Sequence, residues 1–465
     1  MALSKLVLLF QSLSLKEMAV YLPTSDKEVK KLFDYLQNLR QSTDLERYSR
    51  KDAYIATYGV APYNDQRMRL LESRLVAQLE EVMLNQQLQE TPLVQSSLRV
   101  QAYHRRNLSK SYRFAYAFFN KQLEADVQLD RHYYKYRLAH QHLDYQSKHA
   151  ADRQSLPFDQ VVDALDSWFI AAKLKHACEI INARNVMEVK ATLRMIDQVR
   201  EWADQEPFAT DPAVMVYRWV YDSLTKPEDE MPFEQLSTFM RLNGHRFPLQ
   251  DQREIYQYLK NYCIKKLNTG LTTFTRKLFD IYRMTLDNET LLKEEYMSPF
   301  EFKNIVTIGL RLGEHDWVSA FIPSHLKYLD PVQQKNAEVY NSGNLYFFRK
   351  EYKSTLRLFQ QVEFTDVFYA LDVRSIILKT YFEQGEEELF NYQAAAFRTY
   401  LSRNKEISEY QRTIYRNFIR FAAQLVKSDG DPATLAKIIA DMDSVKQIAD
   451  LRWLREKADK WLQAG

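Results

Sequence analysis

The chain has 465 residues, of which 46% are hydrophobic and 27% are charged, and these proportions exclude a disordered protein. It contains only 9 Gly and 13 Pro, too few for the tight turns of a sheet protein of this length. The composition therefore predicts an all-α protein. The formal net charge of +3 is too small to indicate binding to nucleic acid or membranes by itself.

The N-terminal segment predicts a helix. Its apolar run, residues 6–10, is shorter than the core of a secretory signal, and no small-residue cleavage site follows it. Leu3, Leu6, Phe10 and Leu13 instead share one helical face. No segment reaches the ~18 apolar residues of a membrane span. We expect a soluble cytoplasmic protein that does not associate with membranes.

Helix boundaries are marked along the whole chain. Ser14 with Glu17 and Ser25 with Glu28 have the spacing of capping boxes. An Asp or Ser followed by Pro predicts a helix start at positions 211–212, 298–299, 330–331 and 431–432. Gly313 and Gly385 follow apolar periodic runs and predict helix ends.

Positive charge is concentrated in residues 99–137, where nine Lys or Arg stand against three Asp or Glu, a local charge of +6. Cations alternate with aromatic residues there, and such a surface can follow a phosphate backbone and stack bases. The candidate nucleic-acid contacts are Arg105, Arg106, Arg113, Arg131, Lys135 and Arg137. We favour the alternative explanation that these are amphipathic helices whose Arg and Lys stems lie over Tyr rings.

The His and Cys residues do not predict a metal site. His140 and His142 face apart on one helix, and His142 and His149 are two turns apart. Cys178 and Cys263 lack the spacing of a zinc site or a disulfide framework. We expect both cysteines to be buried in a reducing compartment.

Residues 146–158 are the predicted boundary between two regions. They divide the chain into an N-terminal helical region, residues 1–150, and a helical-repeat region, residues 151–465. The same stretch fits an ordinary loop between helices, in which case the two regions are continuous.

The C-terminal third shows an internal repeat. Trp317 and Tyr352 are 35 residues apart, Ala320 and Thr355 keep that register, and so do Tyr346 with Tyr381 and Lys350 with Gly385. A period near 34 predicts stacked helical hairpins, because one hairpin cannot bury its apolar face alone. The predicted fold is an α-solenoid, a right-handed superhelix of such hairpins.

The clearest repeat unit is residues 339–359. Gly343 and Tyr346 are on its first helix, and Tyr352, Thr355 and Phe359 are on its second. We expect the two helices to approach closely at Gly343 and Thr355. The unit resembles the tetratricopeptide repeat, but Thr355 stands where that family usually has Ala, and Val367 where it often has Pro.

A second resemblance covers most of the chain. Several phrases, in order, are similar to those of an uncharacterised family of helical-repeat proteins from Bacteroidota-type bacteria: residues 10–17, 173–178, 261–270, 302–305, 316–322, 415–418 and 452–454. The resemblance implies a tetratricopeptide-like helical fold. It implies no activity.

The sequence predicts a binding protein rather than an enzyme. It lacks phosphate-binding glycine loops and nucleophile motifs, so we expect no catalytic residues, cofactor or metal. The favoured hypothesis is a non-catalytic scaffold that binds a protein or peptide on the surface of the superhelix. The alternative is an RNA-binding repeat protein that uses the basic face around residues 99–137. A helical enzyme without a visible motif ranks last.

Overall fold

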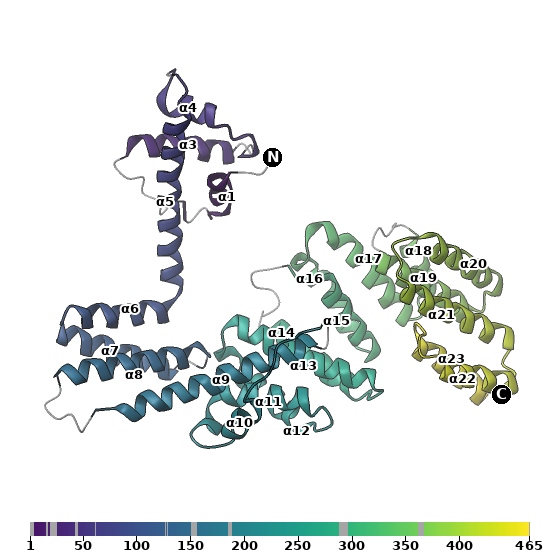
Figure 1. Cartoon of the computed structure of the whole chain (residues 1–465). Coiled ribbons are helices and arrows are strands. Elements are labelled where there is room, and N and C mark those ends of the chain that lie inside the picture. Colours follow the sequence, from purple (N-terminus) through teal and green to yellow (C-terminus); the bar gives the residue numbers. More distant parts are fainter. Residues whose placement is uncertain are drawn as a thin grey trace. The chain divides into compact units, whose positions relative to one another are not determined.

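A computed structural model describes residues 4–14, 17–18, 26–41, 45–60, 62–125, 127, 129–149, 156–184, 188–287, 296–360 and 367–464. Every regular element in these ranges is a helix, which confirms the all-α prediction (Figure 1). The chain divides into two compact units, Met1–Arg218 and Trp219–Gly465. The division falls within a helix. The helices on either side of residues 146–158 pack against each other.

The first unit begins with helices packed around one apolar core. They are α1 (Lys5–Ser12), α3 (Lys27–Gln41), the short 3-10 helix η1 (Leu45–Arg47), α4 (Arg50–Tyr58) and α5 (Asp65–Glu90). Leu6, Phe10 and Leu13 are buried in this core, as their spacing predicts. Leu3 and Ser25 lie outside the described residues, and Asp26 accepts hydrogen bonds from the first backbone N–H groups of α3.

The rest of the first unit consists of longer helices. They are α6 (Pro92–Arg105), α7 (Ser109–Ala125), α8 (Asp130–His149), α9 (Phe158–Arg184), α10 (Ile196–Trp202), η3 (Phe208–Thr210) and the start of α11 (Pro212–Thr225). Helix α8 packs against α6, α7 and α9. Tyr112, Phe119 and Leu138 are among the buried residues between α6, α7 and α8.

The second unit continues with α12 (Met231–Asn243), η4 (Gly244–Arg246), α13 (Leu249–Asn268), α14 (Phe274–Asp287), α15 (Pro299–Arg311), α16 (His315–His325), η5 (Leu326–Tyr328), α17 (Pro331–Phe348), α18 (Tyr352–Phe359), α19 (Val367–Gln384), α20 (Glu387–Arg403), α21 (Glu409–Ser428), α22 (Pro432–Ser444) and α23 (Leu451–Ala464). Successive helices pack against each other. In addition, α17 contacts both α15 and α19.

Apart from the pair of Ser25 and Glu28, the sequence marks for helix starts and ends are confirmed. Ser14 and Glu17 form both hydrogen bonds of a capping box. The side chains at positions 211, 298, 330 and 431 each accept a hydrogen bond from the first turn of the following helix. Gly313 and Gly385 have φ of 76° and 69°, a backbone conformation that favours glycine at a helix end.

The same turn recurs between the two helices of three hairpins. The backbone N–H groups of Glu314, Glu351 and Glu386 donate to the carbonyls of Gly309, Tyr346 and Tyr381, at 3.0, 2.8 and 3.1 Å. This hydrogen bond closes each first helix in the same way. Tyr346 and Tyr381 thus accept equivalent hydrogen bonds, and Lys350 and Gly385, one residue before the donors, both have a positive φ. The repeat as a whole stays a prediction.

The predicted register of the first of these hairpins is wrong. Counted from the turn, Val318 rather than Ala320 is equivalent to Thr355. Val318 and Thr355 are both fully buried, and Ala320 is exposed. The prediction aligned two aromatic residues that occupy different places on their helices. Trp317 packs edge-on against Phe279 of α14, whereas Tyr352 is the first residue of α18.

The close approach at Gly343 is confirmed. A Cβ atom on Gly343 would lie 2.3 Å from ring atoms of Phe359, so no larger residue fits without displacing that ring. The Thr355 hydroxyl donates a long hydrogen bond of 3.5 Å to the Gly343 carbonyl. The backbone of α17 therefore contacts side chains of α18 directly at this position.

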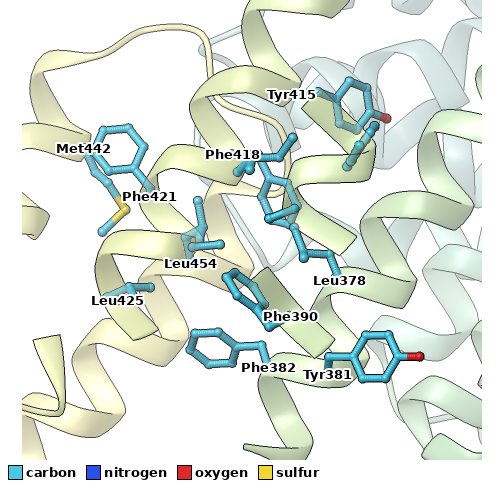
Figure 2. Close-up of a cluster of buried hydrophobic side chains, with 14 of the residues drawn as sticks. Leu378, Tyr381, Phe382, Phe390, Tyr415, Phe418, Phe421, Leu425, Met442 and Leu454 are labelled. Atoms are coloured by element: carbon cyan, nitrogen blue, oxygen red, sulfur yellow. The ribbon is translucent and has the colours of Figure 1, made fainter. Parts of the chain in front are cut away.

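The end of the chain has a continuous apolar core. Figure 2 shows Phe390 of α20, Phe418 of α21 and Leu454 of α23 in the same interior, with Leu378 of α19 beside them. All four are at most 1% exposed. Each helix thus buries its apolar face against several neighbours rather than against its own hairpin partner alone.

Candidate binding clefts

A polar cleft of about 710 Å³ lies in the first unit between α6 and α8. We call it the cationic cleft. Its lining comes from the last turn of α6, the turn that follows, and one side of α8: Gln101, His104, Arg105, Asn107, Tyr133, Tyr136, Arg137, His140, Gln141, Asp144 and Lys148.

Local sequence explains why these side chains meet. Asn107 adopts a left-handed conformation with φ of 55°, and the Leu108 N–H donates to the Tyr103 carbonyl at 3.0 Å. This ends α6 and reverses the chain into α7. Helix α8 then returns across α6 and α7, so its polar side faces the end of α6.

The cleft carries more positive than negative charge. Arg105, Arg137 and Lys148 stand against Asp144, which gives 3 − 1 = +2 with His neutral. Lys148 pairs with Asp144 at 3.6 Å. Arg137 lies 5.6 Å over the Tyr133 ring and donates to its hydroxyl, and neither Arg105 nor Arg137 has a carboxylate partner among the described residues. Two guanidinium groups beside aromatic rings can bind a phosphate or carboxylate attached to a planar group.

Aromatic stacking fixes α8 behind this cleft. Tyr136 stacks on Trp168 of α9 with ring centroids 6.0 Å apart. On another side of α8, His142 stacks on Tyr116 of α7 at 4.1 Å. Burial lowers the pKa of His142, which favours the neutral ring in this aromatic environment.

The structure brings only two of the six candidate nucleic-acid contacts into the cationic cleft, Arg105 and Arg137. Arg106 is exposed beside it and donates to the Ala102 carbonyl. Arg113 is on the exposed side of α7. Lys135 pairs with Glu124 at 3.1 Å, which leaves its charge compensated.

The sixth candidate, Arg131, is buried and serves the fold. It is 6% exposed and forms an ion pair with Asp211, the residue that caps α11. His132 contacts the other oxygen of the same carboxylate at 3.0 Å. Arg131 is therefore unsuited to contact a nucleic acid, because its charge is compensated inside the protein. Sequence could not show this, since the partner is 80 residues away.

A second cleft, of about 550 Å³, lies in the second unit. We call it the hairpin cleft. It is lined by the ends of α15 and α17, one residue of α19 and the start of α23: Leu310, Arg311, Gly313, Asn344, Phe347, Phe348, Lys379, Asp450, Leu451, Arg452, Trp453 and Glu456.

One carboxylate joins the helices that lead to this cleft. Asp372 of α19 forms an ion pair with Lys303 of α15. It also accepts hydrogen bonds from the hydroxyls of Tyr340 of α17, at 3.2 Å, and Tyr415 of α21, at 2.7 Å. Burial, reinforced by the negative charge of Asp372, raises the pKa of both tyrosines, so both remain hydrogen-bond donors. We call these four residues the Asp372 cluster.

Another carboxylate positions α23 at the hairpin cleft. Asp450 accepts hydrogen bonds from Ser375 at 2.7 Å and Lys379 at 2.8 Å, both on α19. Burial opposes its ionisation, but the charge and hydrogen bond of Lys379 outweigh burial and lower the pKa of Asp450. Its backbone carbonyl accepts from Leu454 in the first turn of α23.

Three cations line the hairpin cleft, Arg311, Lys379 and Arg452. Arg452 pairs with Glu456 at 2.8 Å and Lys379 with Asp450, so Arg311 is the one lining cation that forms no ion pair with a carboxylate of the described chain. Burial and the positive charge of Arg452 lower the pKa of Arg311, and the nearby carboxylates of Asp450 and Glu456 oppose this shift, so its charge is partly compensated without a direct ion pair. Phe348 is 37% exposed beside it. An acidic group next to an apolar side chain fits this surface.

Sequence reasoning assigned no binding role to any residue of the hairpin cleft, although it marked Gly313 as a helix end. The Asp372 cluster spans positions 303 to 415, with intervals of 69, 32 and 43 residues from Asp372, and forms no local pattern. The only features near the cleft that short sequence patterns indicated are the ends of α15 and α17, marked by the positive φ of Gly313 and Lys350.

The two cysteines are buried, as predicted, and form no disulfide. Burial raises the pKa of the Cys263 thiol to about 12. The helices of the described chain include none with both the length and the apolar character to cross a membrane.

Comparison with protein-family models, with curated proteins and with solved structures gives no match for this chain. The resemblances to tetratricopeptide repeats and to the Bacteroidota-type family therefore stay predictions.

Asp211 predicts a pH-dependent stability of the first unit. Burial opposes its ionisation, but the hydrogen bond and charge of His132, the charge of Arg131 and the Val214 N–H lower its pKa to about 2. A lowered pKa stabilises the fold above the unfolded value of 3.8, and the stabilisation is lost as the pH falls through the folded value. We expect Asp211→Asn to remove about 2 kcal/mol at neutral pH.

Urea unfolding followed by circular dichroism at a series of pH values checks this. The gap between wild type and Asp211→Asn should close as the pH falls from about 4 to about 2. Asp197→Asn, at an exposed position of α10, is the matched control and should behave like the wild type. A gap that stays constant with pH would contradict the assignment.

Proposed function

We propose that the chain is a non-catalytic scaffold and that its second unit binds a peptide segment of a partner protein in the hairpin cleft. In this proposal α15 to α22 form a tetratricopeptide-like solenoid, a right-handed superhelix, with the first helices of its hairpins on the binding side. The observation that carries it is the convergence of α15, α17 and α19 on one cleft that holds Arg311, a cation without a direct ion pair in the described chain.

The chemistry of the cleft favours an extended acidic segment. Arg311 can donate two parallel hydrogen bonds to a carboxylate. Phe348 offers an apolar surface for a neighbouring side chain of the same peptide. Because the Asp372 cluster and Asp450 fix the surrounding helices, the ligand meets a preformed surface, and little ordering accompanies binding.

A cytoplasmic location in a bacterium completes this proposal. The two buried cysteines without a disulfide support a reducing compartment.

The peptide proposal is tested by selecting peptides from a random phage library on the full chain. We expect enriched peptides to contain Asp, Glu or a C-terminal carboxylate next to an apolar residue. In fluorescence anisotropy with the labelled peptides, Arg311→Glu should weaken binding roughly tenfold or more, because a hydrogen bond to a charged group contributes about 1.5–3 kcal/mol. Phe348→Ser should also weaken it, because the substitution removes an apolar surface that the peptide covers.

The control is Arg398→Glu, which reverses an exposed charge on α20 outside the cleft. It should leave peptide binding unchanged. Peptides that bind wild type and Arg311→Glu equally, or no enrichment at all, would contradict the proposal.

RNA binding at the cationic cleft is the second candidate. It is favoured by one observation: Arg105 and Arg137, remote in sequence, face the same cleft beside Tyr133 and Tyr136. A single-stranded RNA fits such a surface, with phosphates at the guanidinium groups and a base on an aromatic ring. Of the other candidate contacts, Arg131 and Lys135 have compensated charges, and Arg106 and Arg113 are exposed outside the cleft.

Anisotropy with a labelled single-stranded RNA tests this candidate. Arg105→Glu combined with Arg137→Glu should weaken binding, and the slope of its salt dependence should fall by about one for each phosphate that is no longer neutralised. Arg99→Glu is the matched control, because Arg99 is exposed in the same basic segment but outside the cleft lining. An equal loss of affinity from Arg99→Glu, or no RNA binding by the wild type, would rule the cleft out.

A further inference from the structure

Helix α7 exposes an aromatic and basic face. Phe114 and Phe118 are 77% and 53% exposed, one turn apart. Lys110, Arg113 and Lys121 are exposed on the same side of the helix, because their spacing places all five residues within about 140° of its circumference. No acidic residue of the described chain pairs with these three cations. We call these five residues the α7 face.

Helix α9 exposes a matching aromatic and acidic face. Phe158, Val162, Leu165 and Phe169 are 58%, 54%, 39% and 37% exposed. Their spacing places them within about 60° of one another around the helix. We call this apolar stripe, together with the acidic residues along one edge of it, the α9 face.

The acidic edge consists of Asp159, Asp163 and Asp166, all of them exposed. No cation of the described chain forms an ion pair with them. The α9 face therefore has the same design as the α7 face, an apolar strip beside a row of like charges, but with the opposite sign.

The two faces can overlap along much of their length. The basic row of α7, residues 110 to 121, covers about 16 Å of helix, and the acidic row of α9, residues 159 to 166, covers about 10 Å. The apolar stripe of α9, residues 158 to 169, is longer than the pair of Phe114 and Phe118 that it would cover. Laid side by side, the helices would bury Phe114 and Phe118 against the stripe. The Lys and Arg side chains would then lie opposite the Asp row.

Within one chain the two faces do not cover each other. Helix α8 packs against both α7 and α9, and both faces are exposed although they belong to the same unit. A second copy of the chain carries both complements. Under two-fold symmetry, each copy gives its α7 face to the α9 face of the other, so one arrangement makes the contact twice.

We propose that the α7 and α9 faces form the interface of a symmetric homodimer. Its ligand is a second copy of this chain. The proposal assigns Arg113, a candidate nucleic-acid contact in the sequence, to this interface. It is independent of the peptide and RNA sites, because neither cleft includes a residue of either face.

Sedimentation velocity of the full chain over a wide range of concentrations tests the proposal. The wild type should be a dimer. Reversal of the basic row, Lys110→Glu with Arg113→Glu and Lys121→Glu, should raise the dimer dissociation constant by at least roughly tenfold, since it places like charges opposite each other. Reversal of the acidic row, Asp159→Lys with Asp163→Lys and Asp166→Lys, should do the same.

The decisive variant carries both reversals in one chain. It restores opposite charges at each contact, and its dissociation constant should return to within a few fold of the wild-type value. The circular dichroism of every variant serves as the control for folding, which exposed substitutions should leave unchanged.

Three outcomes would overturn the proposal. The first is a wild type that stays monomeric at every concentration. The second is a combined variant that associates no better than either single reversal. The third is an open-ended series of assemblies, which would exclude the closed two-fold arrangement.

Discussion

The second unit depends on one carboxylate, Asp372, which holds together four helices that are distant in sequence. Its side chain is 25% exposed and is therefore only partly solvated. The ammonium group of Lys303 and the hydroxyls of Tyr340 and Tyr415 supply those partners, from α15, α17 and α21. A carboxylate with several charged or polar donors fixes geometry as well as energy, because each donor has to come from one direction.

The apolar packing around this cluster also depends on contacts among several helices. A pair of short helices buries only part of its apolar surface, so each hairpin needs its neighbours. At the C-terminal end the neighbours are α19 to α23, which share the core of Figure 2. The Asp372 cluster adds direction to this otherwise non-directional packing. Together they place the ends of α15 and α17 at the hairpin cleft and Asp450 at its edge.

Local chemistry was predictable from the sequence and distant pairing was not. Capping side chains and glycines at helix ends act within a few residues, so Ser298, Asp330, Gly313 and Gly385 could be assigned from the chain alone. The close approach of two helices at Gly343 and Thr355 could also be predicted, from a pattern within residues 339–359, but the ring that fills the space at Gly343, that of Phe359, was seen only in the structure. The equivalence of Val318 with Thr355 could not be predicted, because the aromatic residues used for the alignment pack in different places in each hairpin.

The basic segment shows the same limit for electrostatics. A sum of charges over residues 99–137 treats every cation alike. In the folded chain, Arg131 is buried in an ion pair with Asp211, and Lys135 forms an ion pair with Glu124. Arg113 is exposed on α7. Arg105 and Arg137 line the cationic cleft. Because neighbouring residues of a helix point in different directions, one basic stretch supplies several surfaces with different uses. To predict a site on helices, one therefore has to know which face of its helix each residue lies on, as well as which segment of the chain it belongs to.

Hydrogen exchange measured by mass spectrometry on Asp372→Asn tests the central claim most directly, with Asp441→Asn at an exposed position of α22 as control. Substitution removes the ion pair with Lys303 and weakens the bonds from both tyrosines. The account predicts faster amide exchange in α15, α17, α19 and α21 together, and no change in the control. Faster exchange confined to α19, with the other three helices as protected as before, would contradict it.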